Sequence, residues 1–172
     1  MTMPDDLSSQ TDAFEARERP DEHGSIPERI HWLLTGQPYA VLCTQSRSQP
    51  YGSLVAFAAS DDLKTLVFST PTTTRKYRLL IECEHVALLI DSRSACPGEM
   101  MQIEAVTATG HAHVIAPGKE FERWAGLLTA RHTHLAPFVR AESSALVRVD
   151  VVRYLHVCRF QEVHQWIPGS DT

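Results

Sequence analysis

The segment best equipped for chemistry is FSTPTTTRK, residues 68–76, which joins a row of hydroxyl groups to two adjacent cations. A strand pattern ends at Ser69 and a helical pattern covers residues 72–82, so Arg75 and Lys76 fall in a first helical turn, where the helix dipole favours acids. A bound anion removes this conflict, because free backbone N–H groups, threonine hydroxyls and two cations would together hold a phosphate. An ordinary capped helix with solvated cations is the alternative, and the local pattern leaves both interpretations open. No GxGxxG or GxxxxGK[ST] motif is present, which argues against a Rossmann or P-loop nucleotide site.

The nine histidines include two His-x-His pairs, His111/His113 and His132/His134. Residues two apart on a strand share a face, so His111 and His113 could chelate a metal. No third ligand stands at a helpful spacing, and we therefore favour a solvated polar stripe and expect no metal site. His132 and His134 fall where a helical pattern ends, a position that suits a histidine.

The elements around these groups are mostly strands. Strand patterns are found at 39–45, 51–59, 65–69, about 100–115, 145–150, 154–158 and 160–167. The run at 86–91 is apolar on both faces and predicts a buried central strand. Helices are predicted over 72–82, over 119–131, and after a capping box at Ser25, ending with a left-handed Gly36. Short turn-rich linkers favour antiparallel pairing. We expect a mainly β fold, a six- to seven-stranded antiparallel barrel flanked by helices, because closure removes exposed edges.

Composition limits the class of protein. The 172 residues carry a formal net charge of −5, which disfavours nucleic-acid binding. The acidic residues 1–24 predict a mobile arm, leaving one folded domain at 25–172. We find no signal sequence and no apolar run long enough to cross a bilayer. The four scattered cysteines include no CxxC pair, so a reducing cytoplasm is the expected compartment.

The order of these pieces resembles the FMN-binding split-barrel family related to pyridoxamine 5′-phosphate oxidase. The resemblance covers about residues 37–167 and is carried by PYAVLCTQSRSQPYGSLVAFAA, LKTLVFSTPTTTRKYRLLIECEHVALLID, VTATGHA and FQEVHQWI. Its most specific element is Ser/Thr-Arg-Lys at the start of a helix, followed by a Val-rich strand that ends in an acid.

The resemblance implies a split β-barrel, an FMN cofactor and a homodimer with flavin at the interface. It implies that Arg75 and Lys76 bind the FMN phosphate, assisted by Thr74 and Thr70. The remaining cofactor contacts that it implies are the backbone of Ser53, Leu54 and Val55 at the polar edge of the flavin, Ser69 in the pocket wall, and Trp166 at the partner's flavin.

The sequence departs from true pyridoxamine phosphate oxidases. Their C-terminal Arg-Leu-His-Asp-Arg-like cluster, which grips the substrate phosphate, is replaced by VRVDVVRYLHVCRF, and Ala105 stands where the family places a glutamine beside the flavin. Vitamin B6 oxidation is therefore not expected.

We expect an FMN-dependent oxidoreductase of a small molecule, with NAD(P)H as a possible electron donor and Tyr51 and His164 as the candidate catalytic residues. The alternative is a non-catalytic flavin or haem-binding protein of the same fold, with His156 and His164 as possible haem ligands. A deazaflavin-binding reductase is a third possibility.

Overall fold

The computed structural model describes residues 20, 24–95, 100–159 and 161–170. It contains seven strands: β1 (Tyr39–Ser46), β2 (Gln49–Ala59), β3 (Thr65–Pro71), β4 (His85–Asp91), β5 (Ala105–Val114), β6 (Ser144–Cys158) and β7 (Glu162–Trp166). Apart from residues 20 and 24, the predicted acidic arm at 1–24 lies outside the described residues, so its mobility stays a prediction.

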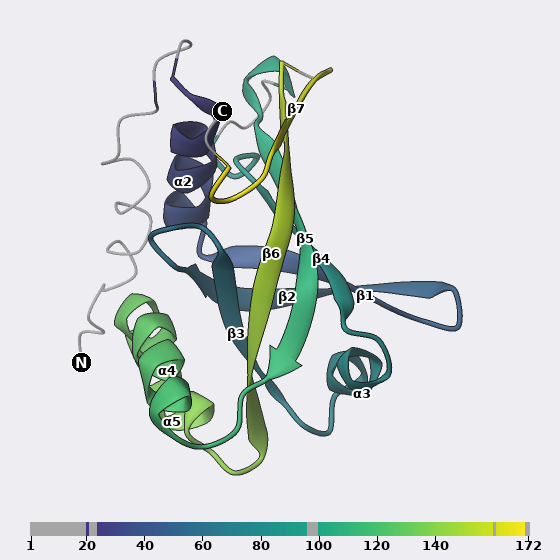
Figure 1. The fold of residues 1–172 in the computed structure, drawn as a ribbon, viewed down its shortest axis with the longest axis vertical. Helices are drawn as coiled ribbons and strands as arrows, with labels where there is room; N and C mark the ends of the chain where they lie inside the picture. The colour runs from purple at the N-terminus through teal and green to yellow at the C-terminus, as the bar shows by residue number, and fades with distance from the viewer. Residues whose placement is uncertain (1–19, 21–23, 96–99, 160, 171–172) are drawn as a thin grey trace, which may run out of the picture.

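The strands form one antiparallel sheet in the order β3-β2-β1-β4-β5-β6-β7, and β3 also pairs with β6. That additional pairing closes the first six strands into a barrel and leaves β7 attached to β6 alone (Figure 1). The expected mainly β, six- to seven-stranded antiparallel barrel is confirmed.

Helices cover the barrel on two sides. The helical elements are α2 (Ile26–Gly36), α3 (Arg75–Glu82), α4 (Lys119–Arg131), α5 (Ala136–Val139) and the short 3₁₀ turns η1 (Met100–Gln102) and η2 (Thr133–Leu135). Figure 1 shows α2, α4 and α5 on one side of the barrel, and α3 on the other side beneath the projecting β1–β2 hairpin. None of the helices described is long and apolar enough to cross a membrane.

Alternation along β5 shows how the sequence fills the barrel. Val106, Ala108 and Ala112 are buried, whereas Thr107 and Thr109 on the opposite face are only partly covered. Gly110 is also buried. A Cβ atom there would lie 2.2 Å from the carbonyl oxygen of Asp150 on β6, so the position requires a glycine. The predicted division of this strand into an apolar and a polar face is therefore confirmed up to Val114, which is exposed.

The start of α2 agrees with the sequence, but its end does not. The Glu28 carboxylate accepts a hydrogen bond from the Ser25 N–H at 2.8 Å, as the capping box predicts. Gly36 does not adopt a left-handed conformation; it is the last helical residue, and Gln37 follows in extended backbone. The carbonyl groups of Leu34, Thr35 and Gln37 instead accept hydrogen bonds from the Arg131 guanidinium at the end of α4, which makes a glycine stop unnecessary.

Two strand predictions need correction. Residues 100–102 form a 3₁₀ turn rather than the start of β5, and Met100 and Met101 are exposed. The two strands expected at 145–150 and 154–158 are one continuous strand, β6. The β5–β6 register shifts between Thr109 and Gly110 and leaves Val152 unpaired in a bulge. This extra residue reverses the alternation along β6, which is why the sequence pattern looked interrupted.

Candidate functional site

The site is built around the start of α3, where β3 runs into the helix through the turn at 72–74. Thr74 is the N-cap, and its hydroxyl oxygen accepts a hydrogen bond from the Tyr77 N–H at 3.3 Å. The same oxygen lies 3.1 Å from the Thr70 hydroxyl. The first turn of α3 contains no acid, so the helix N-terminus keeps its positive partial charge.

Both cations of this first turn fold back onto β2. The Lys76 ammonium donates a hydrogen bond to the Leu54 carbonyl oxygen at 2.8 Å. The Arg75 guanidinium stacks over the Tyr51 ring, 4.8 Å from its centroid. Burial lowers the pKa of Lys76. Among the described residues neither cation has a carboxylate partner, so two consecutive residues carry positive charges that no acid compensates.

The adjoining part of β2 offers both a polar and an apolar surface. The Ser53 hydroxyl is buried without a hydrogen-bond partner among the described residues. Leu54, on the opposite face of the strand, is 64% exposed, and Val55 belongs to the core. We call Ser53, Leu54, Thr74, Arg75 and Lys76 the α3 corner. It combines two cations and an uncovered apolar side chain with an unpaired hydroxyl that is buried on the opposite face of β2.

The two remaining residues of the predicted site, Ser69 and Thr70, lie on β3. The Ser69 hydroxyl already has a hydrogen-bond partner, and Thr70 is buried. The Ser69 hydroxyl donates to the Ala145 carbonyl oxygen on β6 at 3.0 Å, so in this structure it ties two strands together. Thr70 is 1% exposed and reaches the corner only through its contact with Thr74. The structure therefore places both beneath the corner.

The sequence that forms these strands and helices matches the model of a known family. A sequence profile described as pyridoxamine 5′-phosphate oxidase matches residues 26–158. The chain belongs to the pyridoxamine 5′-phosphate oxidase family. A search of curated proteins found no match.

Solved structures with the same fold are named after different bound groups. A haem-binding protein from Mycobacterium smegmatis has a TM-score of 0.70 at 14% identity, over 79% of this chain and 55% of that one. The haem storage protein of Vibrio cholerae has a TM-score of 0.64 at 13% identity, over 84% and 94% of the two chains. An FAD-binding protein from Mesorhizobium loti has a TM-score of 0.62 at 14% identity, over 77% and 94%. The chain thus spans little more than half the length of the first of these, and at such identities the likeness establishes the fold alone.

Two of the predicted site residues lie on β7, away from the α3 corner of the same chain. Trp166 stacks on Tyr154, with ring centroids 5.8 Å apart and an interplanar angle of 25°. Tyr154 lies nine residues along β6 from Ala145, the partner of Thr70, and this separation corresponds to roughly 30 Å. Trp166 therefore cannot reach the corner of its own chain. His164 is exposed on the same strand.

Beside β7 the structure brings together a buried triad that the sequence analysis did not detect. Glu104 accepts hydrogen bonds from the Arg29 guanidinium at 2.6 Å and from His156 Nε2 at 2.7 Å. Side-chain exposure is 9% for Arg29, 2% for Glu104 and 0% for His156. The three residues come from α2, the segment before β5, and β6, so no local motif signals their meeting. His164 stacks over His156 at 6.2 Å between ring centroids.

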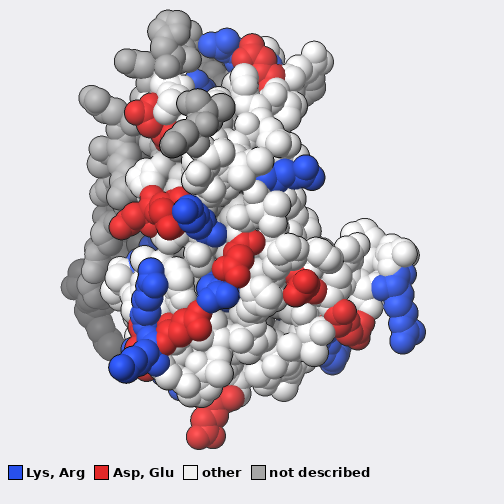
Figure 2. All heavy atoms as spheres, in the orientation of Figure 1, with Lys and Arg blue, Asp and Glu red and all other residues white. Residues whose placement is uncertain are grey.

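Figure 2 shows acidic and basic side chains interspersed on one face of this pyridoxamine 5′-phosphate oxidase family member, with uncharged surface between them. The charge on that face therefore comes in both signs and does not form one extended basic area.

Proposed function

We propose that this chain is an FMN-dependent oxidoreductase of a small molecule and that it holds the FMN phosphate at the α3 corner. The observation that carries the proposal is the pair of cations at a helix N-terminus with no carboxylate partner among the described residues, one of them bound to a strand carbonyl and partly desolvated. Uncompensated positive charge at such a position costs stability, and a bound anion removes that cost.

The residues of the corner fit the cofactor. Arg75 and Lys76 would form charge-assisted hydrogen bonds to the phosphate, and Thr74 would add a hydroxyl. The unpartnered Ser53 hydroxyl and the neighbouring backbone of Leu54 and Val55 would meet the polar edge of the ring system. FMN supplies hydride or electron transfer, and the protein supplies binding and orientation.

The proton donor and the subunit arrangement belong to the same proposal. Tyr51, held under Arg75 beside the corner, and His164, exposed on β7, are the residues we propose to donate a proton. We also propose a homodimer, in which Leu54 is covered and Trp166 of one subunit approaches the flavin of the other. The free thiols of Cys43, Cys83 and Cys158 suit a cytoplasmic location, which we propose as well.

Haem binding without turnover is the second candidate. Two of the structures described above are named as haem-binding or haem storage proteins, and His164 is exposed above a second histidine. In that case His164 and His156, rather than Arg75 and Lys76, would determine cofactor affinity.

The absorption spectrum of the purified full-length protein separates the two candidates. Two flavin bands that bleach under anaerobic NADH or NADPH support the oxidoreductase, whereas a sharp Soret band supports haem binding. If the protein is colourless, added FMN is titrated by fluorescence quenching, and absence of FMN binding would refute the proposal.

The double substitution Arg75→Ala/Lys76→Ala tests the location of the phosphate. Two charge-assisted contacts of about 1.5–3 kcal/mol each predict at least a hundredfold weaker FMN binding, allowing for non-additivity. Arg78→Ala is the matched control, since Arg78 is an exposed cation on the same helix. Unchanged affinity in the double variant, or equal losses in variant and control, would refute the assignment.

A further inference from the structure

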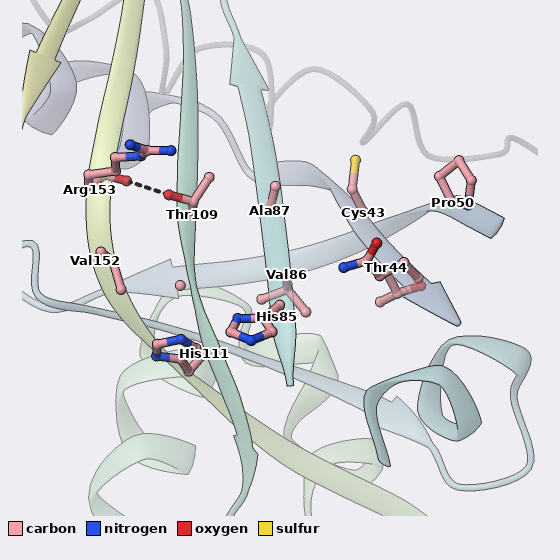
Figure 3. Close-up of a pocket in the computed structure, with 12 residues that line it drawn as sticks. Cys43, Thr44, Pro50, His85, Val86, Ala87, Thr109, His111, Val152 and Arg153 are labelled. Atoms are coloured by element: carbon pink, nitrogen blue, oxygen red, sulfur yellow. Dashed lines mark hydrogen bonds between the residues drawn. The ribbon is translucent and has the colours of Figure 1, made fainter. Parts of the chain in front are cut away.

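A hollow lies on the outer face of the barrel and is lined mainly by residues of β1, β4, β5 and β6. Its volume is about 430 Å³, and its polar lining includes His85, Thr109, His111 and Arg153. Figure 3 shows the His85 and His111 rings close together at one end of this hollow. No residue of the α3 corner lines it.

The strand register holds the two histidines together. His85 on β4 is the direct partner of His111 on β5, and their ring centroids are 4.9 Å apart with an interplanar angle of 62°. Glu84, the residue before β4, is fixed beside β5 because its carbonyl oxygen accepts a hydrogen bond from the Ala112 N–H at 2.8 Å. One ligand atom from each of Glu84, His85 and His111 lies within 4.8 Å of the others.

Within the described part of the chain, these three side chains have no polar partner. Neither imidazole and no oxygen of the Glu84 carboxylate takes part in a hydrogen bond or an ion pair there. Other histidines differ: His113 lies 3.6 Å from the Asp150 carboxylate, and His156 is bound to Glu104. Two imidazole nitrogens and one carboxylate oxygen are thus gathered at one point and available.

A second cluster is less suited to a metal. Cys158, Glu162 and His164 also bring three ligand atoms within 4.8 Å of one another. However, the Cys158 thiol donates to the Glu162 carboxylate at 3.7 Å, and Glu162 also pairs with Arg159 at 3.4 Å. Burial raises the pKa of Cys158, which opposes formation of the thiolate that a metal requires.

We propose that Glu84, His85 and His111 form a binding site for a divalent transition-metal ion of the zinc class. Two neutral imidazoles and a carboxylate are the donor set of such ions, whereas Mg²⁺ and Ca²⁺ prefer oxygen ligands. Ligand atoms at about 2.0–2.2 Å from a tetrahedral metal lie roughly 3.3 Å apart, so the three side chains need only small rotations to close around it. Three protein ligands leave a coordination position open to water on the side of the hollow.

Isothermal titration calorimetry with Zn²⁺ on the untagged, chelator-treated full chain tests this site. We expect one Zn²⁺ per chain. His85→Ala and His111→Ala should each weaken the affinity at least about tenfold, because even outer-shell partners of a metal change affinity by about that much. Glu84→Gln should weaken it less, since the amide oxygen keeps a neutral donor.

Two controls make the outcome decisive. His31→Ala removes an exposed histidine on α2 and should leave Zn²⁺ affinity unchanged. Cys158→Ser removes the thiol of the second cluster and should also leave it unchanged. Absence of Zn²⁺ binding, wild-type affinity in both His85→Ala and His111→Ala, or a loss confined to Cys158→Ser would each overturn the proposal. Circular dichroism melts establish that the variants compared are folded.

Discussion

The α3 corner and the buried triad are two charged regions of opposite character. In the triad, Arg29, Glu104 and His156 are almost fully buried and bound to one another. In the corner, Arg75 is exposed and Lys76 half-buried, and their contacts are an aromatic ring and a backbone carbonyl rather than an acid. A buried charge with its partner in place joins elements of the fold, here α2 to the barrel. Two neighbouring cations without an acid partner in the described part of the chain leave capacity for a ligand.

This contrast predicts that the triad determines stability, whereas the corner determines ligand binding. Substitutions in the triad should lower the free energy of unfolding and leave the FMN affinity of folded molecules unchanged. Substitutions of the corner cations should weaken FMN binding and leave the free energy of unfolding almost unchanged. The variants below test the contrast, beginning with the largest expected effect.

Glu104→Gln should give the largest loss of stability. It removes the negative charge that is bound to the buried Arg29 guanidinium, and breaking such a buried ion pair typically costs about 3–5 kcal/mol. Urea unfolding measures the change. Glu122→Gln is the control, because Glu122 pairs with Arg140 at 2.8 Å on the surface, where such a pair contributes less than about 1 kcal/mol. If the two substitutions lower the free energy of unfolding equally, the buried triad contributes no more to stability than a surface ion pair does.

FMN affinity should depend on pH through Lys76. Burial lowers the pKa of this amine, so the free protein binds its proton less tightly than the unfolded chain does. The free protein therefore gains stability as the pH rises from that lowered pKa towards the ordinary lysine value of about 10.4. FMN phosphate needs the charged amine, so its affinity should fall by about tenfold or more as the pH rises through the lowered pKa.

Lys76→Arg distinguishes this titration from others, since arginine keeps its charge throughout the alkaline range. The FMN affinity of this variant, measured by fluorescence quenching across the same range, should stay level. A parallel fall in wild type and Lys76→Arg would assign the pH dependence to another group.

Thr74→Ala should have the smallest of these effects. It removes the N-cap hydrogen bond to the Tyr77 N–H and should cost about 1 kcal/mol of stability in urea unfolding. Thr73→Ala, an exposed neighbour in the same turn, should change stability by less than about 0.5 kcal/mol. If Thr73→Ala proves as costly as Thr74→Ala, the cap does not position the corner.

Local patterns predicted most of the fold. Alternation along β5 identified its buried face, and the capping box identified the start of α2. Predictions failed where a distant partner decides the structure. The end of α2 depends on Arg131, and the continuity of β6 depends on a bulge at Val152 opposite β5. Neither feature leaves a signal in its own stretch of sequence.

The same distinction applies to the candidate sites. Arg75, Lys76 and Thr74 are neighbours in the chain, so their conflict with the helix dipole was visible in the sequence. His85 and His111 meet only through the β4–β5 register, and Glu104 meets Arg29 across 75 residues. The sequence analysis paired His111 with His113 because they share a strand face, yet in the structure His113 lies beside Asp150 and His111 beside His85.

The bonds from Arg131 to the end of α2 also have a consequence for biosynthesis. Arg131 and Leu34 are 97 residues apart, and at about 5–20 residues per second this corresponds to a delay of roughly 5–20 s between their synthesis. During that interval the last turn of α2 exposes the carbonyl groups that Arg131 later binds, and the barrel against which α2 packs is not yet closed, because β6 follows α4 in the chain. Of the helices that the structure describes, α2 is the first to be synthesised, yet we expect it to be among the last elements to reach its final form. A nascent chain stalled before α4 should therefore leave the end of α2 open to proteases or chaperones.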